Sequence, residues 1–278
     1  MIIAAVAERV LRAAGTVPGV ELRGLDHRLD DVEFLVPEWG QAPPDLAAMP
    51  ALRVVQVLSA GTDWIEVPAG VTLCNARGTR DIPVAEWVVG AIVGAASGLL
   101  RSARDREWEH RPPAEVHGSR VVIVGHGSIG RATAERLEAL GAHVTGIGRD
   151  GDLLRLVSGA DTIVNLVPLT EASRRMFDSH VFAAMRDGTL FVNAGRGRTV
   201  DQEALLAEVT PPRLFAVLDV TDPEPLPAGH PLWSAPGVLA ITSHHAGDSH
   251  EAETRAVQLA VEQLRAYAAG EPLRNVVR

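Results

Sequence analysis

Three polar segments of the sequence follow apolar runs, and each carries a side chain suited to carbonyl chemistry. Arg196 lies in the motif NAGRG, Glu224 in LDVTDPEPLP and His244 in TSHHAG. Residues that follow the strands of a parallel sheet gather at one edge, where ligands bind. A guanidinium can bind a carboxylate and polarise a carbonyl, a histidine can protonate the carbonyl oxygen, and a neighbouring carboxylate can orient the histidine. Hydride transfer from a nicotinamide to a 2-oxo acid requires this set of groups.

A glycine-rich segment stands between an apolar run and a helix-like stretch. The run Val121–Val124 leads into G-H-G-S-I-G, and the stretch Arg131–Leu140 follows. The first glycine permits a tight turn, the second lets a pyrophosphate approach the backbone, and the third allows the helix to pack closely on the strand. A plain glycine-rich turn is the alternative, but the order strand, glycines, helix, strand favours dinucleotide binding. We interpret His126 as a spacer, and the predicted binding residues are Gly125, Gly127, Ser128, Ile129 and Gly130.

The next apolar run, His143–Ile147, ends at the residues that should choose between the two nicotinamide cofactors. NAD enzymes usually place an acidic residue here, where it accepts hydrogen bonds from the ribose 2′-OH. Gly148 takes that place, and Arg149 can pair with a 2′-phosphate, which favours NADP and leaves NAD possible. In the alternative interpretation, Arg149 is a solvated loop residue and Asp150 bonds the ribose.

Short apolar runs alternate with helix-like stretches along the chain, which predicts an α/β fold with a parallel sheet. The runs are rich in Val, Ile and Leu and are bounded by Gly, Pro or Asp, as buried parallel strands are. We predict two long helices, one from about Pro83 to about Glu109 and one from about His250 to about Ala269. The predicted strands are Arg53–Leu58, Arg120–Val124, His143–Ile147, Thr162–Leu166, Thr189–Asn193, Phe215–Asp219 and Val238–Thr242.

Composition and charge exclude several kinds of chemistry. The 278 residues carry a formal net charge of −9, which disfavours nucleic acid as a partner. All 26 basic residues are arginines, so no lysine can form a Schiff base or complete a Walker A loop. The single cysteine, Cys74, excludes an intrachain disulfide and a multi-cysteine metal site. The adjacent His244 and His245 point opposite ways on an extended segment, so we predict no metal site.

The N-terminus carries no recognisable signal peptide. Glu8 and Arg9 interrupt its apolar start, and no basic region precedes that start. No apolar run reaches the length that spans a membrane. We therefore expect a cytoplasmic protein with no membrane partner.

The polar motifs together resemble those of the D-isomer-specific 2-hydroxyacid dehydrogenases. NAGRG, LDVTDPEPLP and TSHHAG carry the resemblance, together with Ser59–Asp63, Asn75 followed by PVAE, and Pro168–Thr170. The similarity covers the chain from about residue 35. It implies that His244 is the acid/base, paired with Glu224, and that Arg196 orients the substrate. It also implies that the backbone around Ser59, Ala60 and Gly61 holds the substrate carboxylate.

The resemblance further implies cofactor contacts and an architecture. Thr170 and Asp219 would lie near the nicotinamide, with Asp219 on its carboxamide; the other implied cofactor contacts are Arg149, Pro168, Ala194, Gly195 and Gly247. We expect a Rossmann-type doubly wound parallel sheet inserted in a second, smaller flavodoxin-like α/β substrate domain, with the active site in the cleft between them. Residues 93–248 would bind NAD(P), and residues 1–92 and 249–278 would bind the substrate. The family commonly forms homodimers through the cofactor domain, so we expect a homodimer.

The sequence departs from the family pattern in a few places. Its first hundred residues are shortened, Ser243 stands where proline is usual, His245 replaces a common aliphatic residue, and Val164–Leu166 replaces a Ser-Leu-His run. None of these changes removes a catalytic group. We therefore predict an NAD(P)-dependent oxidoreductase that interconverts a small 2-oxo acid and a D-2-hydroxy acid, similar to glyoxylate/hydroxypyruvate reductases. The alternatives are a corepressor-like protein that senses the cofactor without turnover, and a phosphite- or formate-type dehydrogenase on the same scaffold.

Overall fold

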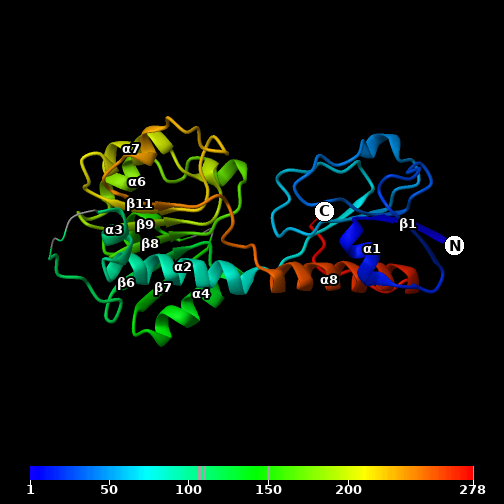
Figure 1. Cartoon of the computed structure of the whole chain (residues 1–278), viewed down its shortest axis with the longest axis horizontal. Helices are drawn as coiled ribbons and strands as arrows, with labels where there is room; N and C mark the ends of the chain where they lie inside the picture. The colour runs from blue at the N-terminus through cyan, green and yellow to red at the C-terminus, as the bar shows by residue number, and fades with distance from the viewer. Residues whose placement is uncertain (106–107, 109, 149–150, 278) are drawn as a thin grey trace. The chain divides into compact units, whose positions relative to one another are not determined.

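The computed structural model describes residues 1–105, 108, 110–148 and 151–277. The chain forms two compact units (Figure 1). Residues 1–80 and 248–278 make one of them, which we call the split unit, and residues 81–247 make the other, the central unit. Each unit contains a parallel sheet of its own. None of the described helices is long and apolar enough to cross a membrane.

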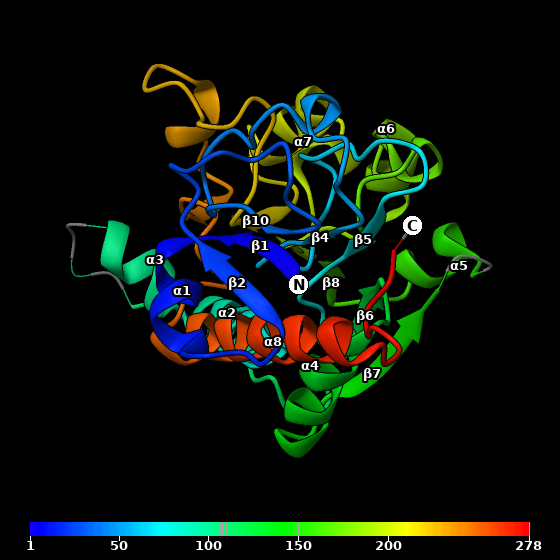
Figure 2. The same cartoon turned by 90° about the vertical axis from the view of Figure 1, so that its right-hand side faces the viewer.

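The split unit is built on a five-stranded sheet with the order β2-β1-β3-β4-β5, the flavodoxin-like order. Helices α1 and α8 cover one face (Figure 2), where Val10 and Val257 pack against Val6. Loops and a short 3-10 turn cover the other face. The elements are β1 (Ile2–Val6), α1 (Glu8–Ala14), β2 (Val20–Arg23), β3 (Phe34–Val36), β4 (Val54–Gln56), β5 (Thr72–Cys74) and α8 (His250–Ala269).

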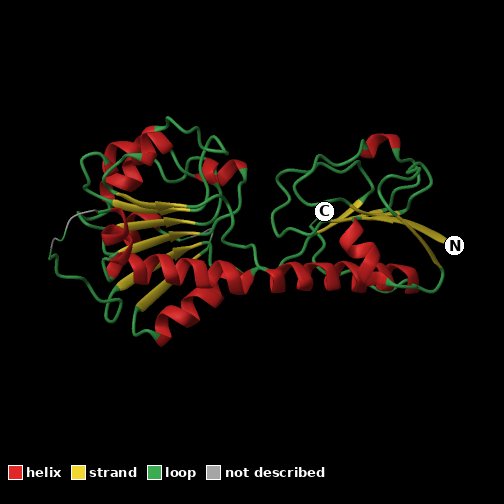
Figure 3. Ribbon diagram, in the orientation of Figure 1, coloured by secondary structure: helices red, strands yellow, loops and turns green. Residues whose placement is uncertain are grey.

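The central unit is built on a six-stranded parallel sheet with the order β11-β10-β9-β8-β6-β7. Helices cover both faces of it (Figure 3), so the sheet is doubly wound. Its strands are β6 (Arg120–Val124), β7 (His143–Ile147), β8 (Thr162–Asn165), β9 (Leu190–Asn193), β10 (Phe215–Leu218) and β11 (Val238–Ile241). Its helices are α2 (Asp81–Ala96), α3 (Leu99–Arg104), α4 (Ser128–Ala139), α5 (Leu153–Val157), α6 (Ser179–Ala184) and α7 (Gln202–Val209).

The strand order of the central unit reverses at β6. The next strand along the chain, β7, pairs on one side of β6, and β8 pairs on the other. The crevice beyond the carboxyl end of such a switch point is where open α/β sheets bind their ligands. The glycine-rich segment follows β6 directly, so it occupies that position.

The predicted fold class is confirmed, and every predicted strand is present within its predicted range. Strands β1, β2, β3 and β5 were missed. They are short, and turn residues do not bound them clearly. The C-terminal helix has the predicted limits because Ser249 caps its first turn through a 3.0 Å bond from the Ala252 amide, and Gly270 ends it in a left-handed conformation.

The other long helix was predicted wrongly in its second half. The helix α2 ends at Ala96, and the chain then turns at Gly98, whose φ is +75°. The short helix α3 follows and ends at Arg104. The apolar run continues across the break, so its periodicity does not mark the turn. The left-handed backbone at Gly98 is what interrupts the helix.

The two units divide earlier than the predicted domain boundaries. Division falls after Arg80 and after Gly247, whereas residues 92 and 248 were expected to end the first two segments. The whole of α2 belongs to the central unit because Val84, Val88 and Ile92 pack in one core with Val121 and Ile123 of β6. Burial of one face of a helix against a sheet decides such a boundary, and a linear sequence does not display that contact.

Candidate active site

The three glycines after β6 form a cradle that fits a dinucleotide. Gly125 turns with φ +99°, and a Cβ there would lie 2.7 Å from the carbonyl carbon of Leu166. A Cβ at Gly130 would lie 2.6 Å from the carbonyl oxygen of Gly125, so only glycine lets α4 start so close to the strand. A Cβ at Gly127 would meet no atom within 4 Å, which leaves open space for a phosphate. Ser128 and Ile129 form the first turn of α4, whose amide groups lack partners within the helix.

The strand end that should select the cofactor is only partly described. Arg149, which was predicted to hold a 2′-phosphate, lies outside the described residues, as does Asp150. Gly148 is described, and a Cβ there would meet no atom within 4 Å. The position where NAD enzymes carry an acidic side chain is therefore open.

The arginine of NAGRG is held between two glycines whose neighbours explain them. A Cβ at Gly195 would lie 2.8 Å from the carbonyl oxygen of Val167, in the loop after β8. A Cβ at Gly197 would clash with the carbonyl of Thr221 and lie 2.9 Å from the amide of Asp222, in the loop after β10. The loops that follow β8, β9 and β10 thus pack backbone to backbone. Arg196 and the neighbouring Ala194 lie in the middle loop.

A buried network of side chains, missed at the level of sequence, ties these loops together. The amide of Asn165 donates to Asn193 Oδ1 (2.9 Å) and to Thr199 Oγ1 (2.7 Å). Thr199 in turn donates to the carbonyl oxygen of Arg196 (2.6 Å), and Asn193 Oδ1 accepts from the Gly195 amide (3.2 Å). All three side chains are at most 1% exposed. The departure at Val164–Leu166 was the available signal, since a polar residue stands in an otherwise apolar run.

Asn165→Leu should therefore both destabilise the protein and loosen the Arg196 loop. The substitution leaves Asn193 and Thr199 buried without a donor, which costs about 1–3 kcal/mol in the free energy of unfolding. We expect urea denaturation to show this loss and steady-state kinetics to show a raised KM for the 2-oxo acid.

The double variant N165L/T199V is the control for this prediction. Removing both partners of a buried hydrogen bond costs less than orphaning one, so its loss should be smaller than the sum of the single losses. Additive losses would contradict the network.

The loop after β8 is rigid around the two residues predicted to flank the nicotinamide. Thr170 caps a short 3-10 turn (Glu171–Ser173): its hydroxyl accepts from the Ser173 amide (3.2 Å), and Ser173 Oγ accepts from the Thr170 amide (2.8 Å). Ser173 Oγ also donates to the carbonyl oxygen of Pro168 (2.7 Å). Pro168 and Thr170 therefore lie on a fixed wall beside the glycine cradle's strand.

Asp219, at the end of β10, organises the loop that carries the histidine. Its carboxylate accepts from Thr242 Oγ1 (2.5 Å) and from the amides of His245 (3.0 Å) and Ala246 (3.1 Å), while its carbonyl oxygen accepts from the His244 amide (2.8 Å). The residue is 3% exposed. Asp219 was predicted as a cofactor contact, and the structure adds a second role, because its carboxylate fixes the backbone around His244. Gly247 closes the same loop.

The structure brings His244 and Glu224 together as predicted from the motifs. His244 Nδ1 lies 2.5 Å from Glu224 Oε1, although the two residues are twenty positions apart. The side chains are 41% and 40% exposed. His244 has φ +53°, a left-handed conformation that is strained for a residue with a Cβ and that recurs at functional sites. Arg196, Glu224 and His244 follow β9, β10 and β11, three neighbouring strands, at the same edge of the sheet.

The segment predicted to hold a substrate carboxylate lies in the split unit, after β4. Asn75 donates to the carbonyl oxygen of Ala60 (2.7 Å), Ser59 Oγ donates to the carbonyl oxygen of Gly61 (2.7 Å), and Trp64 Nε1 donates to Ser59 Oγ (3.1 Å). These bonds hold the carbonyl groups of the turn. A fixed turn of this kind can present its amides to an anion.

Among the described residues, no cluster of His, Cys, Asp and Glu side chains could hold a metal ion. His245 Nδ1 lies 3.4 Å from Ser243 Oγ. Burial raises the pKa of the Cys74 thiol to about 11, so this thiol is not a nucleophile at neutral pH.

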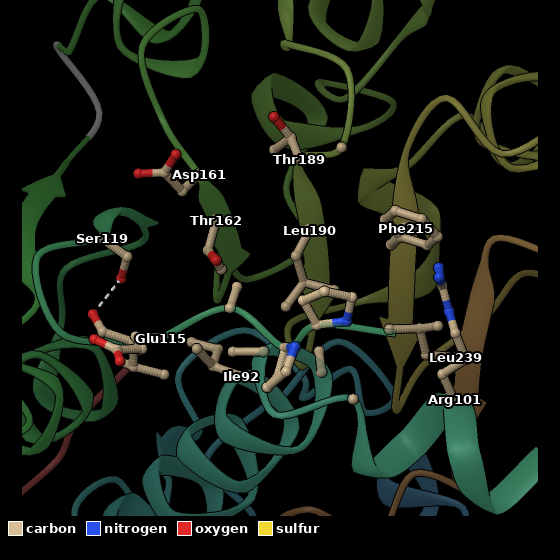
Figure 4. Close-up of a pocket in the computed structure, with 18 of the residues that line it drawn as sticks. Ile92, Arg101, Glu115, Ser119, Asp161, Thr162, Thr189, Leu190, Phe215 and Leu239 are labelled. Carbon is tan, nitrogen blue, oxygen red and sulfur yellow. Dashed lines mark hydrogen bonds between the residues drawn. The ribbon is translucent and has the colours of Figure 1, made fainter. Parts of the chain in front are cut away.

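A cavity of about 710 Å³ lies at the opposite edge of the central sheet (Figure 4). Its lining includes Thr162, Leu190 and Phe215, at the amino ends of β8, β9 and β10, and the guanidinium of Arg101 lies 4.7 Å from the Phe215 ring centre. Burial raises the pKa of Asp161 at this cavity, but hydrogen bonds from the Arg120 amide and Arg186 lower it overall. No predicted site residue lines this cavity.

Comparison with known proteins points to one family. The model of the D-isomer specific 2-hydroxyacid dehydrogenase NAD binding domain matches residues 91–246. The chain is 32% identical to the (S)-sulfolactate dehydrogenase of Chromohalobacter salexigens over 244 residues, 79% of each chain. It is 31% identical to glyoxylate/hydroxypyruvate reductase B of Salmonella typhimurium over 259 residues, 84% of this chain and 80% of the relative.

Solved structures share the whole fold. An NADPH-dependent glyoxylate/hydroxypyruvate reductase from Sinorhizobium meliloti, solved with NADP and sulfate, superposes with a TM-score of 0.85 at 25% identity. The match covers 100% of this chain and 98% of that one.

Proposed function

Since the chain belongs to the D-isomer specific 2-hydroxyacid dehydrogenase family, we propose that it reduces a small 2-oxo acid of the glyoxylate and hydroxypyruvate class with NADPH. The chain is a nicotinamide-dependent oxidoreductase of 2-hydroxy acids and the corresponding 2-oxo acids. The relatives named as glyoxylate/hydroxypyruvate reductases support the substrate class. The sulfolactate relative extends the set to be tested to 2-oxo acids with a second anionic group.

The observation that carries the chemistry is the 2.5 Å contact between His244 Nδ1 and Glu224 Oε1. A carboxylate on Nδ1 fixes the imidazole ring and leaves Nε2 free to hold the mobile proton. The bound NADPH supplies a hydride to the carbonyl carbon. His244 donates the proton from Nε2 to the carbonyl oxygen, so that the 2-oxo acid becomes the 2-hydroxy acid. Because 41% of the His244 side chain is exposed, solvent can return the proton.

Arg196 would bind the substrate carboxylate and polarise the carbonyl through its planar guanidinium. The backbone amides around Ala60 and Gly61 would take part in holding that carboxylate. The packed loops on either side of Arg196 support this role because they restrict the backbone from which the guanidinium extends. A catalytic group held within narrow limits loses little freedom in the transition state.

The glycine cradle would hold the pyrophosphate, and Pro168, Thr170, Ala194, Gly195, Asp219 and Gly247 would surround the nicotinamide end of the cofactor. The open position at Gly148 supports NADP over NAD, since no acidic side chain there repels a 2′-phosphate. Arg149 would pair with that phosphate.

The test is a panel of 2-oxo acids that includes glyoxylate, hydroxypyruvate and a sulfonated 2-oxo acid, followed through cofactor absorbance with NADPH and NADH in parallel. Turnover with NADPH preferred is the expected result. Tight binding of NADPH with no turnover on any acid would favour a cofactor-sensing protein. Oxidation of phosphite or formate instead would place the chain with dehydrogenases of that type. Equal efficiency with NADH would overturn the NADP preference.

We also propose that the protein works in the cytoplasm as a homodimer assembled through the central unit. The cavity at the amino ends of the strands supports this assembly, since Gly98, Arg101 and Arg111 from its lining bracket a segment with exposed apolar side chains. Leu99 is 66% exposed, and Trp108 is fully exposed. Large apolar side chains exposed together mark interaction surfaces.

Trp108→Glu is therefore expected to shift the protein from dimer to monomer in size-exclusion chromatography with light scattering. A charge placed in an interface that excludes water is costly to bury. Trp233→Glu is the matched control, because Trp233 is 46% exposed and lies away from the segment. A monomeric wild-type protein would contradict the proposed assembly.

A further inference from the structure

The imidazole of His126 lies on the backbone of the edge strand β7. The pattern of the glycine-rich segment does not require a histidine at this position, which only separates two glycines. A Cβ built on Gly146 would clash with Cγ and Cδ2 of His126 and would lie 2.7 Å from its Nδ1. The glycine at position 146 is therefore what makes room for the ring. Its φ is not left-handed, so the backbone itself does not call for glycine there.

The ring is held close to the end of β7. The amides of Gly125 and His126 both donate to the carbonyl oxygen of Ile147, at 3.0 and 3.2 Å. Ile147 is the last residue of the strand, and Gly148 beyond it opens onto space. In this fold, the residue at that strand end bonds the 2′-position of the adenosine ribose. An imidazole between the glycine-rich turn and the strand end is therefore a neighbour of the 2′-position.

The chemistry of imidazole suits a phosphate at this place. Imidazole donates at least one N–H hydrogen bond in either charge state, and it donates two when protonated. Hydrogen bonds to a phosphate dianion are charge-assisted, and they are stronger than the bonds a neutral 2′-hydroxyl would make. Within reach of the ring, the described part of β7 offers no acidic side chain, since Thr145, Gly146, Ile147 and Gly148 surround it.

We propose that His126 binds the 2′-phosphate of NADP(H) and that Gly146 is the seat which holds its ring in place. The assignment rests on the proposed preference for NADP and gives that preference a residue inside the described structure. His126 is a binding residue in this proposal, and Gly146 acts through it as a positioning residue.

The experiment measures binding by calorimetry and needs no turnover. The probes are adenosine 2′,5′-bisphosphate and 5′-AMP, which differ only in the 2′-phosphate. Loss of one charge-assisted hydrogen bond predicts that His126→Ala weakens the bisphosphate by about 10- to 100-fold while 5′-AMP keeps its affinity. Gly146→Ala should give a similar loss although His126 is still present, because the new Cβ displaces the ring. His143→Ala, at the exposed start of β7, is the matched control and should leave both affinities unchanged.

The double variant H126A/G146A completes the test. If Gly146 acts only through the ring, the double variant binds the bisphosphate no more weakly than H126A alone. Equal weakening of both probes in H126A would show a merely structural role and overturn the proposal, as would full discrimination in both single variants. A wild-type protein that does not prefer the bisphosphate would instead overturn the NADP preference itself, and the assignment of His126 with it.

Discussion

Replacing His244 with alanine is expected to lower kcat for 2-oxo acid reduction by about 10²- to 10⁴-fold, the usual contribution of a positioned general acid. The reason is that Glu224 holds Nδ1 at 2.5 Å and leaves Nε2 as the proton donor. Stopped-flow or steady-state absorbance of NADPH measures the rate. The affinity for NADPH, measured separately by fluorescence quenching, should change little because the glycine cradle is untouched.

Backbone strain at His244 calls for a second variant. Its φ of +53° disfavours alanine, so His244→Ala could lose activity through a rearranged loop. Asparagine tolerates this left-handed conformation better than other residues with a Cβ, and it cannot supply a proton at neutral pH. We expect His244→Asn to be as inactive as His244→Ala. Recovery of activity in the asparagine variant would mean that His244 serves the backbone and not the chemistry.

Replacing Arg196 with glutamine is the second large expected effect. Two charge-assisted hydrogen bonds to a carboxylate contribute about 1.5–3 kcal/mol each, so kcat/KM for the 2-oxo acid should fall by about 10²- to 10⁴-fold. Most of the loss should come from KM, since binding of the substrate carboxylate precedes the chemical step. Arg196→Lys keeps the charge but loses the planar fork, and it should recover only part of the activity.

Arg198 offers a matched control two positions along the same segment. Its side chain is 61% exposed and lies 3.6 Å from Asp222, a surface ion pair of little energetic weight. Arg198→Gln should leave kcat/KM within about twofold of the wild-type value, because such surface pairs contribute at most about 1 kcal/mol. If Arg196→Gln behaves like Arg198→Gln, the substrate carboxylate binds elsewhere.

Much of the fold follows from local patterns. The strands of the central unit are short apolar runs bounded by Gly, Pro or Asp, and each lies within its predicted range. The helix α8 carries both of its end signals, Ser249 and Gly270, in the sequence itself. Strands of three or four residues, such as β3 and β5, are too short to show a period. The break at Gly98 is hidden inside an apolar run that suits a continuous helix.

The site divides in the same way. The glycines at positions 125, 127 and 130 are readable because each performs a local task, and the structure gives each its expected neighbour. The roles of Asn165 and Thr199 are not readable, because their bonds join residues more than thirty positions apart. Asp219 was assigned to the cofactor from its motif. Its bonds to Thr242, His245 and Ala246 became visible only when β10 and β11 were placed side by side.

By itself, the sequence determined the kind of chemistry and the class of cofactor, since these depend on side-chain types and on spacing within short segments. Only the tertiary structure decided which loops press against Arg196, what fixes the backbone of His244 and why position 146 is glycine. Close packing explains the difference. A contact between two strands of a sheet restricts both residues at once, and neither residue shows that restriction in its own neighbourhood of the chain.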